Sequence, residues 1–187
     1  ILSACAHSAS GGIESEELAA RSGPAGKRSF DLLDSDQTGI DFVHHWVSPE
    51  TRSFTFGQVF MGCGIAIGDY DGDRRPDLYL CRAQGGDRLY RNLGAFRFED
   101  VTERAGLKDD DYWGMTGTFA DINNDGHLDL YLCGYDATNK LFVNQGDGTF
   151  KDEAAAFELD FRGASVIMAF ADYDLDGDLD GYLLTNH

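Results

Sequence analysis

The sequence has little positive charge, little proline and no long apolar run. Fifteen Lys and Arg residues stand against 33 Asp and Glu, which leaves a formal charge of −18. Because phosphate contacts need Lys and Arg, this balance argues against non-specific nucleic-acid binding. No stretch approaches the roughly 18 uncharged apolar residues of a membrane-spanning helix. With 3 Pro against 23 Gly, we expect many tight turns and few proline-rich linkers.

Familiar catalytic patterns are missing as well. The sequence contains no G-x-S-x-G motif, no phosphate-binding loop and no nucleophile–base pair. His44, His45 and Trp46 have no Cys or acid at a suitable spacing, so we predict a partly buried aromatic strand there. Residues 38–43 are predicted to form a lead strand just before it. We therefore expect no enzyme activity from this stretch of chain.

The acidic residues are concentrated in three nine-residue clusters within an otherwise globular composition. Hydrophobic residues make up 42% of the chain, with 13 Phe and 8 Tyr, which excludes a disordered acidic tail. The clusters begin at Asp69, Asp121 and Asp172, so their starts lie 52 and 51 residues apart. We name them loop 1 (69–77), loop 2 (121–129) and loop 3 (172–180). This spacing indicates an internal repeat whose units stack to bury their core.

Each loop places a carboxylate or amide at positions 1, 3, 5 and 9, a pattern that suits a hard cation with oxygen ligands. Position 7 varies freely, as expected if it contributes its backbone carbonyl. No His or Cys occupies a side-chain ligand position, which disfavours zinc, and magnesium prefers fewer protein oxygens. We therefore predict up to three Ca²⁺ sites. The predicted ligands are Asp69, Asp71, Asp73, Arg75 and Asp77 in loop 1, Asp121, Asn123, Asp125, His127 and Asp129 in loop 2, and Asp172, Asp174, Asp176, Asp178 and Asp180 in loop 3.

Two alternative structures for these loops fit the sequence less well. An EF-hand loop needs a bidentate acid at position 12, which is Leu in all three loops, and joins helices where strand-type runs occur here. Solvated Asp/Gly/Asn turns without a metal are the second alternative, and three loops in register argue against them. Arg74 replaces the glycine of the other loops at a turn position, which puts site 1 in question. Asn123 leaves loop 2 with one charge fewer, so we expect weaker binding there.

The repeat unit predicts an all-β fold of four-stranded antiparallel blades, about 51–52 residues each, as in a β-propeller. In unit one we predict strands at 63–68, 77–81, 88–92 and 96–101, with turns at 85–87 and 93–95. In unit two we predict strands at 115–120, 129–133, 140–144 and 149–152, with turns at 136–139 and 145–148.

The D-x-D-x-D-G-x-x-D-L loops, together with the segments RLYRN, KLFVNQGDGTF and FEDVTERAGL, resemble FG-GAP/VCBS repeats. More narrowly, they are similar to secreted bacterial proteins of the ASPIC/UnbV and cartilage-acidic-protein group. The resemblance covers residues 54–187 and implies a calcium-bearing, integrin-α-like propeller of about seven blades. On this basis we expect a lead region at 29–53, blade 1 at 54–107, blade 2 at 108–160 and the start of blade 3 at 161–187. The chain would then be the front of a longer protein.

The N-terminal residues Leu2, Ser3, Ala4 and Cys5 match a bacterial lipobox at the end of a signal sequence, although chance could also produce so short a match. If the match is a true lipobox, Cys5 is lipidated, and its acyl chains are the protein's only attachment to the membrane. Residues 6–28 would then be a tether, with a short helix at 14–21. The protein would be secreted or anchored at the cell envelope, where calcium is plentiful.

The three further cysteines, Cys63, Cys81 and Cys133, can either form a disulfide or pack as small apolar side chains. Cys81 and Cys133 occupy equivalent positions, and we predict small buried apolar residues there. The sequence also allows a disulfide between Cys63 and Cys81 as an alternative. If Gly68 pairs with Leu78, Cys63 is only a diagonal neighbour of Cys81, which would strain the bond.

We expect a monomeric, calcium-stabilised propeller that presents a surface to an extracellular protein or glycan. The alternative is a scaffold within a larger extracellular enzyme, for example a polysaccharide-degrading one, whose catalytic region lies downstream. A purely structural role in adhesion or envelope assembly is a third possibility.

Overall fold

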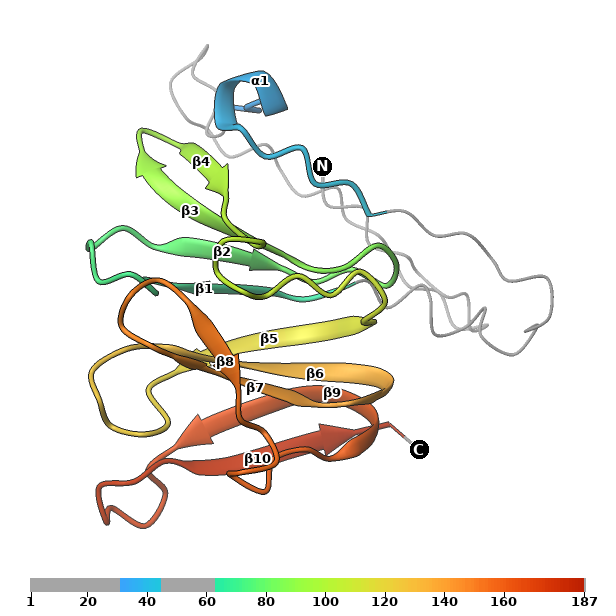
Figure 1. The fold of residues 1–187 in the computed structure, drawn as a ribbon, viewed down its shortest axis with the longest axis vertical. Helices are drawn as coiled ribbons and strands as arrows, with labels where there is room; N and C mark the ends of the chain where they lie inside the picture. The colour runs from blue at the N-terminus through green and yellow to red at the C-terminus, as the bar shows by residue number, and fades with distance from the viewer. Residues whose placement is uncertain (1–30, 45–62, 187) are drawn as a thin grey trace, which may run out of the picture. The chain divides into compact units, whose positions relative to one another are not determined.

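The computed structural model describes residues 31–44 and 63–186. The described residues from Leu33 onward belong to one compact unit, and the description below concerns that unit. Apart from a single short helix, the described part consists of antiparallel strands and the loops that join them (Figure 1). No helix within it combines the length and apolarity needed to cross a membrane. The predicted lipobox with Cys5, the tether, and His45 and Trp46 lie outside the described residues.

The first repeat forms a four-stranded antiparallel sheet in the order β1-β2-β3-β4, as predicted. Its strands are β1 (Ile65–Gly68), β2 (Asp77–Leu80), β3 (Arg88–Gly94) and β4 (Arg97–Asp100). Tyr79 and Leu89, which pair across β2 and β3, are fully buried in the core on one face of this sheet, whereas the equally buried Tyr90 lies on the opposite face and donates its hydroxyl to Asp41. The alternation of buried and half-buried residues along β2 is typical of a strand with one face on the core.

The second repeat has the same four strands, but its sheet continues into the third repeat. Its strands are β5 (Gly114–Ala120), β6 (Asp129–Thr138), β7 (Lys140–Asn144) and β8 (Phe150–Asp152), followed by β9 (Arg162–Ala171) and β10 (Asp180–Thr185). The predicted turn at 136–139 is wrong, because β6 runs on to Thr138 and pairs there with β9. A register shift between Tyr135 and Ala137 absorbs the Asp136 residue, whose φ is 51°.

The lead strand predicted at 38–43 is also wrong. A one-turn helix, α1 (Ser35–Thr38), occupies its beginning, and residues 39–44 have no regular structure. Asp34 and Gln37 form a reciprocal capping box at the start of the helix, and Gly39, with φ 78°, ends it. The capping box and Gly39 confine the helix to one turn, and residues 40–44 form no ladder with any strand that the structure describes. His44 is exposed, contrary to the partly buried strand predicted for it.

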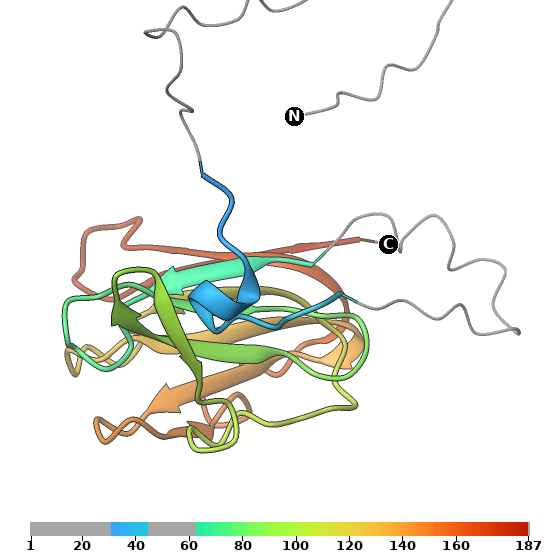
Figure 2. The same cartoon turned by 90° about the horizontal axis from the view of Figure 1, so that it is seen from above.

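The first strands of the three repeats lie next to one another. The Gly64 amide donates to the Met115 carbonyl at 2.6 Å, and the Thr118 hydroxyl donates to the Met168 carbonyl at 2.9 Å. A Cβ on Gly68 would lie 2.9 Å from the Phe119 ring, so glycine permits this close approach. As a result the three loops that follow β1, β5 and β9 gather at one end of the sheets, on the left in both Figure 1 and Figure 2.

Cys81 and Cys133 are buried as predicted, but the strand register considered for a Cys63–Cys81 pair is off by one residue. Cys81 and Cys133 are 3% and 1% exposed, and they and Cys63 are free thiols. Gly68 pairs with Asp77 and not with Leu78. The strand β2 begins at Asp77 as predicted, and Asp77 itself pairs with Gly68, so each pair along β1 and β2 is shifted by one residue and Ile65 lies opposite Leu80.

Candidate metal-binding loops

Each loop turns around the carboxylate at its first position. In loop 1 the Asp69 Oδ1 accepts the Asp73 amide at 3.0 Å, and its Oδ2 accepts the Arg74 amide at 2.8 Å. Asp121 and Asp172 accept the equivalent two amides in loops 2 and 3, at 2.9–3.2 Å. The repeat in the sequence therefore corresponds to one backbone conformation formed three times.

The side chains at positions 3 and 5 each give one oxygen to a loop amide. Asp71 Oδ1 accepts the amide of Asp73 at 3.3 Å, and Asp73 Oδ1 accepts the amide of Arg75 at 3.0 Å. The same pairs recur in loop 2 and in loop 3. Such local bonds hold the side chains on the inside of the loop and, in loops 1 and 3, leave the second oxygen of each aspartate for another partner.

The aspartate at position 9 closes the loop against the next strand. Asp77 accepts the amide of Tyr70 at 3.1 Å and the amide of Asn92, on β3, at 2.7 Å. Asp129 does the same with Ile122 and Asn144, and both aspartates are 0% exposed. Burial raises the pKa of Asp77 to about 6 and also raises the pKa of Asp129. These two ligand candidates therefore have a structural function as well.

Positions 4 and 6 of every loop have left-handed backbone conformations. Position 6 has φ 68° at Arg74, 88° at Gly126 and 99° at Gly177, which confirms that it is the turn position where glycine is favoured. Position 4 also has positive φ, at Gly72, Asn124 and Leu175, which the sequence did not single out. Loop 1 thus reaches the shared conformation despite an arginine at its strained corner.

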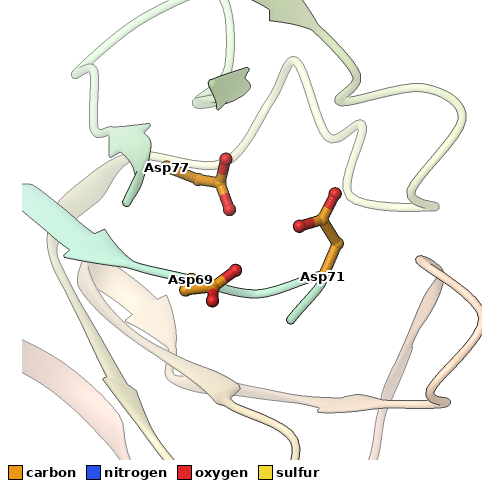
Figure 3. A group of neighbouring side chains, drawn as sticks. All are labelled: Asp69, Asp71 and Asp77. Carbon is orange, nitrogen blue, oxygen red and sulfur yellow. The ribbon is translucent and has the colours of Figure 1, made fainter. Parts of the chain in front are cut away.

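Two of the loops bring three carboxylates together. In loop 1 oxygens of Asp69, Asp71 and Asp77 lie within 4.8 Å of one another, and the three side chains point toward a common centre (Figure 3). In loop 3 the same holds for Asp172, Asp174 and Asp176. Within the described residues loop 2, with Asn123 at position 3, has no such acidic triad. A set of clustered carboxylate oxygens without nitrogen or sulfur fits a hard divalent cation such as Ca²⁺.

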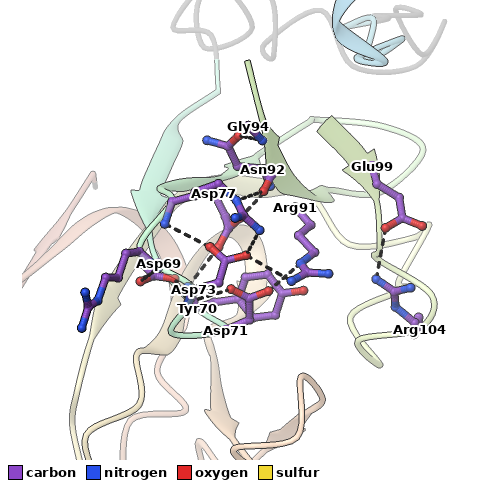
Figure 4. Close-up of polar contacts among 12 residues, drawn as sticks. Asp69, Tyr70, Asp71, Asp73, Asp77, Arg91, Asn92, Gly94, Glu99 and Arg104 are labelled. Atoms are coloured by element: carbon purple, nitrogen blue, oxygen red, sulfur yellow. Dashed lines mark hydrogen bonds and ion pairs between the residues drawn. The ribbon is translucent and has the colours of Figure 1, made fainter. Parts of the chain in front are cut away.

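The acids of loop 1 already have cationic neighbours that the sequence did not point out. Arg91, on β3, places its Nε 2.5 Å from Asp71 Oδ2 and its Nη2 3.1 Å from Asp73 Oδ2 (Figure 4). Arg75 pairs with Asp73 from within the loop. The sequence offered one indication of this ion pair. Repeat one has Arg91 at the position where repeat two has the apolar residue Val143.

The position-7 side chains serve three different purposes, so the predicted role of their carbonyls as ligands stays a prediction. Arg75 Nε donates to the Asn92 carbonyl at 2.8 Å. His127 lines a cavity of about 450 Å³ that it shares with Asp71, Arg91 and Arg104, which we name the seam cavity.

The third of these side chains links two loops. Asp178 accepts a hydrogen bond at 3.1 Å from Asn124 of loop 2, so loops 2 and 3 are directly connected.

Comparison with known families gives a match over the same part of the chain. The model of the FG-GAP-like repeat matches residues 69–132 and again residues 121–183, which together span more than half of the sequence. Each match begins at the first aspartate of a loop. No curated protein matches the chain.

Proposed function

Because the chain belongs to the FG-GAP-like repeat family, we propose that its repeats are successive blades of a calcium-stabilised β-propeller that acts as a binding scaffold. The four-stranded sheet β1–β4 and the neighbouring first strands β1, β5 and β9 support this arrangement. The RLYRN and KLFVNQGDGTF segments favour the ASPIC/UnbV group and about seven blades in the complete ring.

The observation that carries the calcium proposal is the threefold repetition of one loop conformation with inward carboxylates. Three like charges within 4.8 Å repel one another, and this repulsion destabilises the fold unless a cation is near. A bound Ca²⁺ would supply that neutralising charge and link the two ends of a loop. The residues that would hold it are those at positions 1, 3 and 5, with position 9 contributing in loop 1.

We propose that the ion has a structural function and that the surface of the propeller binds an extracellular protein or glycan. Carboxylates held ionised by a metal are poorly suited to move protons, which favours binding over catalysis. Extracellular modules with calcium sites bind the ion with Kd of roughly 10⁻⁴–10⁻³ M, which matches a secreted or envelope-anchored protein attached through Cys5.

Isothermal titration calorimetry tests the metal proposal directly. We expect saturable Ca²⁺ uptake, weaker uptake of Mg²⁺, and a melting temperature that falls when EDTA is added. Each filled site should contribute about 2.7 kcal/mol at a Ca²⁺ concentration of 100 Kd. Asp172→Asn combined with Asp176→Asn should remove one equivalent. Absence of Ca²⁺ uptake at millimolar concentration would contradict the proposal.

The binding role needs a separate measurement. A glycan array probed with the protein in Ca²⁺ and again in EDTA should show ligands that are retained only with the metal. Identical profiles in the two conditions would show that the ion does not shape the binding surface.

A further inference from the structure

Loop 1 differs from the other loops in its balance of charge. Its four aspartates are accompanied by Arg74 and Arg75 within the loop and by Arg91 on β3, which leaves a formal charge of −1, and Arg75 and Arg91 form ion pairs with the loop acids. Loop 3 has five aspartates and no basic residue, which leaves −5. The same backbone conformation is therefore formed once with its countercharge supplied by the protein and once without it.

The guanidinium of Arg91 contacts the carboxylate oxygens of Asp71 and Asp73 that accept no hydrogen bond from the loop backbone. On both Asp71 and Asp73, Oδ1 accepts a loop amide and Oδ2 contacts Arg91. The side chains of Asp71 and Asp73 are 15% and 18% exposed, so these ion pairs are only partly screened by water. Every carboxylate oxygen at positions 3 and 5 of loop 1 is thus already engaged.

Loop 3 shows the opposite situation. Oδ1 of Asp174 and Oδ1 of Asp176 accept the equivalent loop amides. Among the residues that the structure describes, these are the hydrogen bonds that the two side chains accept, so their Oδ2 atoms have neither a donor nor a cationic partner there. A cation that reaches Asp174 and Asp176 therefore competes with no guanidinium among the described residues.

We propose that Arg91 is an internal counter-ion that competes with a divalent cation for Asp71 and Asp73, so that loop 1 fills at a higher cation concentration than loop 3. This inference rests on the proposed calcium binding and concerns the regulation of one of its sites. Ion and guanidinium cannot both hold the same Oδ2 atoms, and each therefore lowers the affinity of the other.

The surroundings of Arg91 allow such an exchange. Its side chain and that of Asp71 both line the seam cavity of about 450 Å³, which has space for a displaced guanidinium and its water. Arg91 is 32% exposed, so leaving the two aspartates does not strand a charge in an apolar core. The exchange needs a side-chain rotation and no rearrangement of β3.

The test isolates loop 1 in the full chain. Asp125→Asn, Asp174→Asn and Asp176→Asn weaken loops 2 and 3 while keeping the side-chain acceptors of their amides. In this background, Arg91→Val copies the residue of repeat two and should lower the calcium Kd of loop 1 about tenfold in calorimetry, equivalent to about 1.4 kcal/mol. Arg91→Gln should act in the same direction, and serves as a second variant if Val disturbs β3.

Thermal unfolding provides a readout that does not depend on the binding isotherm. In EDTA the Arg91→Val protein should melt below the unsubstituted protein, because Asp71 and Asp73 lose their countercharge. In saturating Ca²⁺ the difference should shrink or reverse. Arg97→Val, at an exposed position on the adjacent strand β4, is the matched control and should change neither measurement.

The outcomes separate this inference from the proposed function. If the unsubstituted chain takes up no Ca²⁺, both fail. If it does take up Ca²⁺ but Arg91→Val leaves the affinity of loop 1 unchanged or lowers it, the competition is refuted and calcium binding stands. A tighter loop 1 together with a lower melting temperature in EDTA supports the competition.

Discussion

Loops 1 and 3 have the same internal hydrogen bonds but very different surroundings. Tyr70, at position 2 of loop 1, is 4% exposed, whereas Tyr173, at position 2 of loop 3, is 88% exposed. Repeat two covers loop 1, since Asn144 donates to the Tyr70 carbonyl at 2.8 Å and the Phe150 ring centroid lies 5.7 Å from that of Tyr70. The difference teaches that the conformation of a loop is local, while its burial comes from the repeat that follows.

The largest expected effect concerns this burial. Tyr70→Ala should lower the free energy of unfolding by about 4 kcal/mol, because it removes a buried ring from the seam between repeats. Tyr173→Ala should change it by less than about 0.5 kcal/mol. Urea denaturation of both variants in EDTA measures the contrast without metal. Equal effects would show that the two loops are not packed differently.

A second contrast lies between repeats one and two, at Asp87 and Asn139. Asp87 accepts the Arg82 amide at 2.8 Å and the Tyr79 hydroxyl at 3.2 Å. The equivalent residue in repeat two, Asn139, has an uncharged side chain. Its Oδ1 accepts the Gly134 amide, and its Nδ2 donates to the Tyr131 hydroxyl. One repeat therefore has a buried carboxyl where the other has its neutral counterpart.

This contrast predicts a pH dependence. Burial raises the pKa of Asp87 to about 7, so the folded protein keeps this proton between about pH 4 and pH 7 while the unfolded chain releases it. Asp87 therefore contributes stability below pH 4 that is lost as the pH rises to 7, on the order of 4 kcal/mol.

Chemical denaturation across this pH range checks the prediction. The difference between the wild-type chain and Asp87→Asn should grow with pH in favour of the variant. Asn139→Asp should impose the same pH dependence on repeat two. A constant difference from pH 4 to pH 7 would mean that Asp87 titrates normally.

The aspartate at position 9 gives a third, smaller contrast. Asp77→Ala leaves two buried amides without an acceptor, but it also removes a carboxylate that burial disfavours, so we expect a net loss of about 2 kcal/mol. Asp180 is exposed and accepts only the Tyr173 amide among the described residues, so Asp180→Ala should cost under about 1 kcal/mol. Denaturation in EDTA separates this structural function from any loss of metal.

Much of this arrangement could be predicted because the repeat appears in the sequence itself. The offsets of 52 and 51 residues located the loops, and the apolar runs beside them indicated the flanking strands. The pairing of the end of β6 with β9 could not be found this way. Asp136 and Asn139 are typical turn residues, and only the presence of β9 as a partner keeps the chain extended as far as Thr138.

The candidate site was predicted less completely than the fold. Side chains at alternate loop positions converge because of local geometry, which the spacing conveys. The contact of Arg91 with Asp71 spans 20 residues and depends on the register of β3 against β2, which the spacing does not convey. The hydrogen bond by which Asp77 closes loop 1 likewise depends on the position of the Asn92 amide on the neighbouring strand.

The smallest expected effect concerns Arg74, at position 6 of loop 1. Arg74 has φ 68°, a conformation that costs a residue with a side chain about 1 kcal/mol, whereas loops 2 and 3 have glycine there. Arg74→Gly should raise the free energy of unfolding in EDTA by about 0.5 to 1 kcal/mol, part of the gain being offset by the greater freedom of glycine in the unfolded chain. Arg74→Ala removes the charge but keeps the strain, so it should give no gain. If the Ala and Gly variants gain equally, the charge of Arg74, and not its backbone conformation, is what distinguishes loop 1 at this corner.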